Sequence, residues 1–253
     1  MKQITTVLLI FLHLTTLKSQ ELSPNDQQHI RTLIQHVKAN NKSQICDLVA
    51  YPLTRENPIP AIRNKKELLT RFDEVFDTKL MKTIAQSDLK TDWSAMGWRG
   101  IMLLSGDVWL NSDGKITAIN YQSELEKAKK EKLILAQKSV LHPSLRSFIK
   151  PIYTLQTKTH RIRIDETANN KYRYASWKRT QTQSEKPALI LQNGEINFDG
   201  SGGNHSYIFK SGEYSYICEI IILGTQPNTS YELIVTKNGT ELMRQKAKLY
   251  RKK

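Results

Sequence analysis

The residues with the clearest chemical potential are cationic and aromatic side chains on two successive predicted strands. Arg161 and Arg163 alternate with apolar residues, so both fall on one strand face, which we expect to be exposed to solvent. Guanidinium groups beside aromatic rings suit acidic glycans or single-stranded nucleic acid, by charge and by stacking. The alternative is a solvated face above an aromatic core, with His160 facing inward. The predicted ligand-binding residues are Arg161, Arg163, Arg173, Tyr172, Tyr174 and Trp177.

Residues for nucleophilic or metal-assisted catalysis form no recognisable pattern. There is no G-x-S-x-G motif, and the neighbours His205 and Ser206 lie on a predicted strand, where adjacent side chains point to opposite faces. The histidines are scattered, and neither H-E-x-x-H nor C-x-x-C is present. The sequence therefore predicts no catalytic residues, no metal site and no cofactor.

The two cysteines, Cys46 and Cys218, allow two interpretations. In an oxidising compartment they could form a disulfide. Each also lies among apolar residues at helical or strand spacing, as small buried thiols commonly do. We favour two free thiols and keep the disulfide as the alternative.

The first residues predict export from the cell. Lys2 precedes an apolar run at residues 7–14, and small residues follow, which is the layout of a secretory signal peptide over residues 1–19. The run is shorter than the roughly 20 residues that a membrane-spanning helix needs, so no transmembrane segment is expected after cleavage. We therefore predict a secreted or periplasmic protein without access to cytosolic ATP or NAD.

The charge of the chain favours anionic partners. Lysine and arginine outnumber aspartate and glutamate by 38 to 24, which gives a formal net charge of +14. Such a charge attracts polyanions, and export favours an anionic glycan or cell-envelope polymer over nucleic acid. Another envelope protein is the remaining predicted partner.

The spacing of apolar residues divides the chain into a helical part, a short sheet and a long β region. Amphipathic helices are predicted at residues 24–39, 43–49, 64–76 and 80–84, then strands at 93–98, 101–109 and 115–121 with a hairpin at Asp113-Gly114. A charged helix at residues 123–138 follows as a connector. From about residue 153 onward, strands alternate with turn residues. Hairpins are predicted at Asn193-Gly194, Ser211-Gly212 and Asn238-Gly239.

The predicted fold class is α+β, with N-terminal helices on a curved antiparallel sheet followed by an all-β antiparallel sandwich or barrel. The predicted boundaries are 1–19 for the signal peptide, 20–122 for the α+β domain, 123–143 for the helical connector and 144–253 for the β domain.

The order of elements in residues 22–121 resembles the cone-shaped nuclear transport factor two-like fold, which is also found in SnoaL-like proteins. The helix IRNKKELLTRFDEVF at residues 62–76 and the hairpin GIMLLSGDVWLNSDGKITAIN at residues 100–120 carry the resemblance. It implies a pocket between helices and sheet, which Tyr51, Asp73, Trp93 and Trp98 could line.

Three functions remain open at this point. The favoured one is a non-enzymatic exported binding or interaction protein for an anionic polymer or glycan. The second is a hydrolase or lyase-isomerase that uses the N-terminal pocket. The third is a structural accessory of an envelope assembly.

Overall fold

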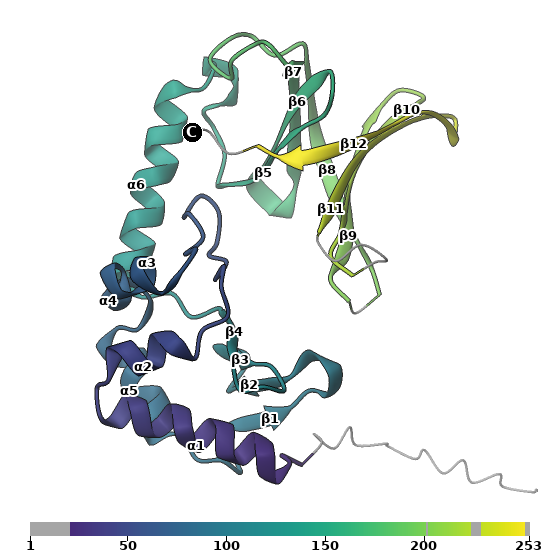
Figure 1. Ribbon diagram of the computed structural model, residues 1–253. Helices are drawn as coiled ribbons and strands as arrows, with labels where there is room; N and C mark the ends of the chain where they lie inside the picture. Colours follow the sequence, from purple (N-terminus) through teal and green to yellow (C-terminus); the bar gives the residue numbers. More distant parts are fainter. Residues whose placement is uncertain (1–20, 201, 224–228, 251–253) are drawn as a thin grey trace, which may run out of the picture. The chain divides into compact units, whose positions relative to one another are not determined.

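The structure is a computed structural model that describes residues 21–200, 202–223 and 229–250 (Figure 1). The described chain forms two compact units. The first comprises the residues up to Thr54 together with Ile62–Ser123, and the second comprises Arg55–Ala61 and the residues from Glu124 onward. Residues 1–19, on which the predicted signal peptide falls, lie outside the described residues.

The first unit is α+β. Its helices are α1 (Pro24–Lys38), α2 (Lys42–Asp47), α3 (Lys65–Thr70), α4 (Phe72–Val75) and α5 (Thr78–Gln86). Its strands are β1 (Trp93–Ala95), β2 (Ile101–Leu103), β3 (Val108–Leu110) and β4 (Ile116–Ile119), which form an antiparallel sheet in chain order. Short 3-10 turns are η1 (Gly97–Arg99) here, and η2 (Pro143–Leu145) and η3 (Ala168–Asn170) in the second unit.

Helix α1 begins where the sequence predicts. The Ser23 hydroxyl accepts from the Asp26 backbone N–H, and the Asp26 carboxylate accepts from the Ser23 backbone N–H, so each satisfies a donor that the helix start leaves free. Ile30, Leu33 and Val37 lie at helical spacing and are buried in the core of this unit. The predicted helix over 64–76 is instead two short helices, because the backbone at Arg71 leaves helical geometry.

The prediction of a single strand over residues 101–109 was wrong. Residues 101–109 form two strands, β2 and β3, that pair with each other around a turn at residues 104–107. Leu104 and Gly106 have φ angles of 51° and 101°, which reverse the chain instead of bulging one strand. The hairpin at Asp113-Gly114 joins β3 to β4 as predicted.

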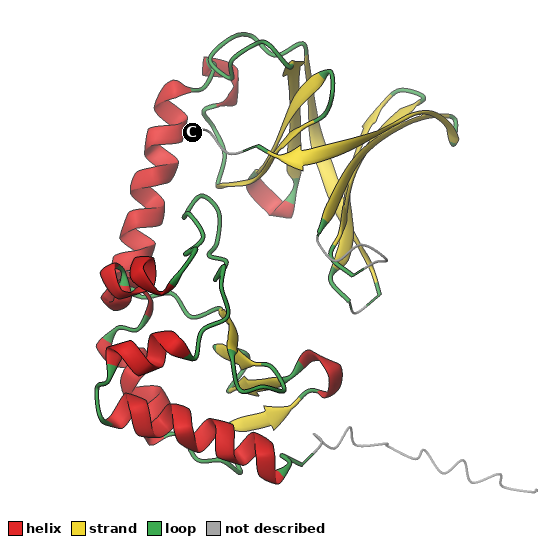
Figure 2. Cartoon of the chain, viewed as in Figure 1, coloured by secondary structure: helices red, strands yellow, loops and turns green. Residues whose placement is uncertain are grey.

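The second unit contains α6 (Glu124–Val140) and a closed antiparallel barrel of eight strands (Figure 2). The strands are β5 (Lys150–Gln156), β6 (His160–Glu166), β7 (Tyr172–Lys178), β8 (Leu189–Asp199), β9 (Asn204–Ser211), β10 (Tyr214–Ile221), β11 (Ser230–Lys237) and β12 (Thr240–Leu249).

The barrel has up-and-down topology, since each strand pairs with its neighbours in sequence. Pairing of β12 with β5 closes the ring through Lys248 with Gln156 and Leu249 with Leu155. Of the two predicted β architectures, the structure therefore has the barrel. The hairpins at Ser211-Gly212 and Asn238-Gly239 join paired strands as predicted.

The hairpin predicted at Asn193-Gly194 was wrong, because β8 continues through it. The first part of β8 pairs with β7 and the second part pairs with β9, so one strand links the two walls of the barrel. Asn193 has a φ angle of 59°, and the pairing register with β7 shifts at this point. The pair of residues therefore bends a strand and does not reverse it.

Gly194 is required because the Phe209 ring packs against its backbone. A Cβ atom at residue 194 would lie 2.2 Å from Cε1 of Phe209. We predict that Gly194→Ala lowers the free energy of unfolding by about 1–3 kcal/mol through overpacking. Urea denaturation followed by circular dichroism would measure the loss. Phe209→Leu should relieve part of it in the double variant, and strictly additive effects of the two changes would contradict the proposed clash.

Candidate functional site

The outer face of β6 and β7 holds a buried ionic network. Asp165 has no exposed surface, and Arg163 and Arg173 are each only 2% exposed. Nη2 of Arg163 lies 2.7 Å from Oδ1 of Asp165, and Nη2 of Arg173 donates to Oδ2 at 2.7 Å. The prediction of a solvent-exposed arginine face is therefore wrong for Arg163, which is buried and pairs with a carboxylate on the same face.

Helix α6 and the segment after it cover this face. Arg163 donates to the Gln137 side chain of α6 at 3.0 Å, and its guanidinium lies 4.9 Å from the centre of the Phe148 ring. Arg173 donates to the backbone oxygens of Leu145 and Ser147. A cluster of buried apolar side chains accompanies these contacts and consists of Leu141, Leu145, Phe148, Ala175 and Trp177.

Trp177 and Arg161 are also occupied by protein contacts. Trp177 is fully buried, and its indole N–H donates to the backbone oxygen of Glu185 at 2.9 Å. Arg161 donates to the backbone oxygens of Gln181 and Arg179 and lies 4.3 Å from the centre of the Tyr250 ring. Four of the six predicted ligand-binding residues thus hold the barrel wall together.

Removal of the central charge tests this network. We predict that Asp165→Asn lowers the free energy of unfolding by about 3–5 kcal/mol, because two buried guanidinium groups lose their counter-charge. As a matched control, Asp73→Asn changes a carboxylate that is 71% exposed and pairs with Lys42, and should cost about 0–1 kcal/mol. Urea denaturation of both variants would measure the difference. Equal losses would show that Asp165 is not a structural centre.

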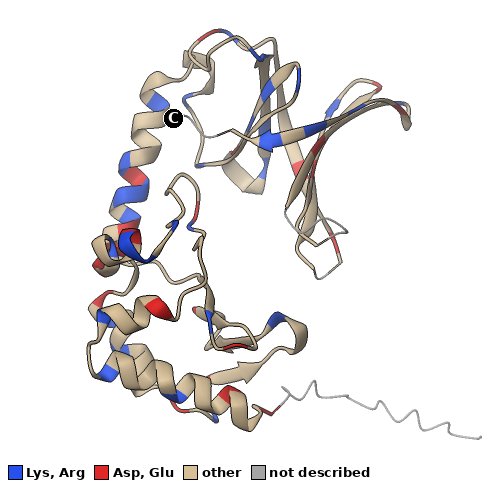
Figure 3. Cartoon of the chain, in the orientation of Figure 1, with Lys and Arg blue, Asp and Glu red and all other residues tan. Residues whose placement is uncertain are grey.

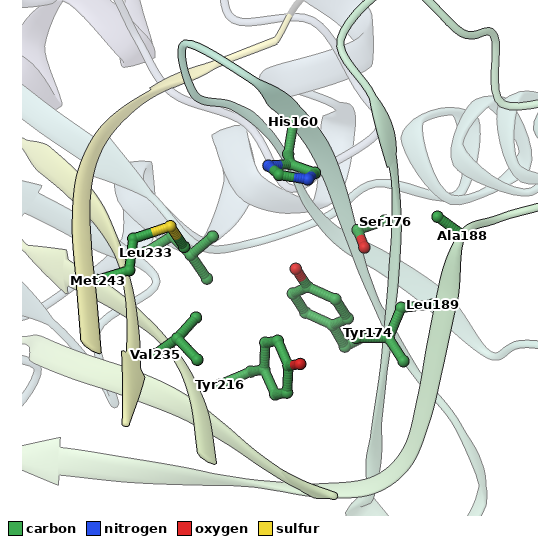
Figure 4. A pocket seen from close by; sticks show the side chains of 9 residues that line it. All are labelled: His160, Tyr174, Ser176, Ala188, Leu189, Tyr216, Leu233, Val235 and Met243. Carbon is green, nitrogen blue, oxygen red and sulfur yellow. The ribbon is translucent and has the colours of Figure 1, made fainter. Parts of the chain in front are cut away.

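Tyr174, another predicted ligand-binding residue, points into the barrel and lines a cavity of about 320 Å³ (Figure 4). Ser176, two residues further along β7, lines the same cavity. His160 also lines the cavity, as expected from its alternation with the apolar residues of β6. The remaining lining residues are Ala188, Leu189, Tyr216, Leu233, Val235 and Met243.

The cavity wall is apolar with a few hydrogen-bonding groups. Leu233 and Val235 are buried on β11, and the rings of Tyr174 and Tyr216 lie 5.7 Å apart. Burial raises the pKa of Tyr174 well above its usual range, so the phenol stays protonated at neutral pH. None of the nine lining residues carries a carboxylate, ammonium or guanidinium group.

Tyr172, the last of the six, belongs to a second aromatic group inside the barrel. Its ring lies 4.8 Å from Tyr207 in an edge-to-face arrangement, and Tyr153 contacts Tyr207 and Tyr231 in the same way. Burial raises the pKa of Tyr153 to about 12. No hydrogen bond joins the hydroxyl groups of Tyr153, Tyr172 and Tyr207 to another described residue, so this interior is held mainly by ring contacts.

The four pocket residues predicted in the first unit do not converge. Asp73 is on the surface, and Trp98 is 68% exposed. Trp93 is buried, and its indole N–H donates to the Ser87 hydroxyl at 2.9 Å. The Tyr51 hydroxyl donates to the backbone oxygen of Cys46 at 3.0 Å. Two of these side chains therefore fill or brace the core, and two face solvent.

Cys46 and Cys218 are both free and both fully buried, each in the core of its own unit. No disulfide joins them in the structure, as the favoured interpretation of two free thiols expects, and that interpretation stays a prediction. Desolvation raises the pKa of Cys46 to about 11 and that of Cys218 to about 12, so both are thiols near neutral pH.

A thiol assay tests the two cysteines. We predict slow reaction of the folded protein with Ellman's reagent at pH 8, since little thiolate forms there, and two reactive thiols after denaturation without reductant. Fewer than two thiols in the denatured sample would require a disulfide and contradict the structure.

Charged groups are spread through both units (Figure 3). On α6 lysines alternate with glutamates, and buried Glu126 pairs with Arg55. Within the described residues, no group of three or more His, Cys, Asp or Glu side chains could hold a metal ion. Of the helices that the structure describes, none is both long enough and apolar enough to cross a membrane.

Sequence reasoning missed most of the cavity residues, although the signal was present. Leu233 and Val235 alternate along β11, and Tyr216 alternates with Cys218 along β10, which places each pair on one strand face. The sequence does not tell which strands close into a ring, so these faces could not be assigned to one cavity.

Comparison of the chain with models of protein families, with curated proteins and with solved structures finds no match.

Proposed function

We propose that the protein is an exported, non-enzymatic binding protein that holds one small, uncharged and mainly apolar molecule inside its barrel. The observation that carries the proposal is the cavity of about 320 Å³ bounded by His160, Tyr174 and Tyr216 among aliphatic side chains. Eight-stranded barrels are just wide enough to be filled by side chains or to hold one small ligand. The cavity volume lies at the lower end of the range of about 300–1,000 Å³ for small-molecule sites.

The side chains that line the cavity limit the polarity and charge of the ligand it can hold. Leu233, Val235 and Met243 offer apolar contact, while His160 and Tyr216 offer hydrogen bonds. An anion or cation would lose its hydration without gaining a counter-charge from the lining, which is costly. A neutral molecule is therefore favoured over the anionic polymer that the net charge predicts.

The cone-like fold, the enzyme hypothesis and the anionic-polymer hypothesis have less support. We propose that the helices and the four-stranded sheet of the first unit are related to the cone-shaped fold, with the element order of residues 22–121 as the support. The hydrolase or lyase-isomerase hypothesis has no support from Asp73, whose carboxylate pairs with Lys42 on the surface. The anionic-polymer hypothesis has no support from Arg163 and Arg173, which are buried and pair with Asp165.

A pair of neighbouring substitutions on β12 tests the proposed function. Met243 lines the cavity, whereas Leu242 is 57% exposed. We predict that N-phenyl-1-naphthylamine, a neutral fluorescent probe, binds the wild-type protein and binds Met243→Trp about tenfold or more weakly, a loss of about 1.4 kcal/mol. Leu242→Trp should bind like the wild type. Fluorescence titration would measure all three affinities, with circular dichroism to verify folding.

No saturable binding by the wild-type protein would contradict the proposed function. Equal weakening by the two tryptophan substitutions would place the binding site of the probe outside the cavity.

A further inference from the structure

A short series of hydrogen bonds holds the imidazole ring of His160, the histidine that lines the cavity. Nδ1 of His160 lies 2.8 Å from the hydroxyl of Thr159, and this hydroxyl donates to Oε1 of Gln245 at 3.1 Å. Nε2 of Gln245 lies 3.3 Å from the sulfur of Met243, which orients the amide with its oxygen toward Thr159. These hydrogen bonds join the residue before β6 to β12, the next strand but one in the barrel.

These hydrogen bonds assign the proton on the imidazole ring. A threonine hydroxyl has one hydrogen, and Thr159 gives it to Gln245. With that proton on Gln245, the oxygen of Thr159 accepts a hydrogen bond from His160, so this arrangement assigns the ring proton to Nδ1. In the neutral ring, Nε2 then has a lone pair and no proton.

Nε2 of His160 is the one ring nitrogen in the lining, and in this tautomer it can only accept a hydrogen bond. Among the described residues, none donates a hydrogen bond to it, and the ring lines the cavity. A ligand that buries Nε2 without a donor would leave a polar atom unpaired, which costs binding free energy.

We propose that the barrel selects ligands that carry a hydroxyl or N–H donor, through a hydrogen bond to Nε2 of His160. The ligand class is thus a small neutral molecule with an apolar body and one donor group, such as a phenol, an alcohol or an indole. This inference rests on the proposed function, because it requires a ligand in the cavity. His160 accepts a hydrogen bond from the donor group of the ligand. Thr159 and Gln245 hold the imidazole ring of His160 in position.

Matched probes separate the donor from the apolar body. The test would compare 2-naphthol with 2-methoxynaphthalene, and indole with 1-methylindole, by isothermal titration calorimetry. The wild-type protein should bind the donor-bearing member of each pair about tenfold more tightly. His160→Leu should bind both members of a pair equally, while His160→Gln, which keeps an acceptor oxygen, should retain part of the preference.

The outcomes distinguish the two proposals. Equal affinities for both members of each pair in the wild type, or an unchanged preference in His160→Leu, would overturn the selection by His160 and leave the binding function standing. No binding of any probe would contradict the proposed function itself. Nitrogen-15 NMR of the wild-type protein tests the assignment without a variant: a protonated Nδ1 and an unprotonated Nε2 are expected, and the opposite tautomer would overturn the proposal.

Discussion

The carboxylate of Asp165 is the charge on which the second unit depends. It lies on β6 without exposed surface and pairs with Arg163 on the same strand and with Arg173 on β7. Burying three charged groups is costly unless they compensate one another, and here the arginines find further acceptors in Gln137 and in the backbone of residues 145 and 147. The pairing therefore positions α6 and the segment after it on the outside of the barrel.

This covering explains why strand β7 is buried on both faces. Arg173, Ala175 and Trp177 face the α6 side, while Tyr172 and Tyr174 face the barrel interior. A strand in an isolated antiparallel sheet would expose one of these faces to water. Because the outer face is covered, the interior is the face of β7 that a small ligand could reach, and the proposed site is on the tyrosine side of the strand.

The sequence predicted local features well and long-range ones poorly. The start of α1, the hairpins at Ser211-Gly212 and Asn238-Gly239, and the inward position of His160 follow from capping, turn chemistry and strand alternation. These features depend on residues that are near one another in the chain. Asp165 lies two residues after Arg163 and so on the same strand face, but its pairing with Arg173 could not be predicted because Arg173 is on the next strand.

Other features depend on contacts between distant segments. The passage of β8 through Asn193-Gly194 accompanies its pairing with β7 on one side and β9 on the other, and closure of the barrel depends on the last residues of β12 meeting β5. Burial of the arginine face depends on α6, whose few apolar residues predicted an exposed connector. No periodicity in a single segment carries this information, so the cavity could not be assembled from the sequence.

The most direct measurement of the central claim is a methyl-resolved NMR titration of the full chain with 2-naphthol. Saturable shifts are expected at one ligand per chain, confined to the methyl groups of Leu189, Leu233, Val235 and Met243 in the cavity. The exposed methyl groups of Leu69, Leu125 and Leu135 should not shift. Shifts at the exposed residues with none in the barrel would contradict the central claim.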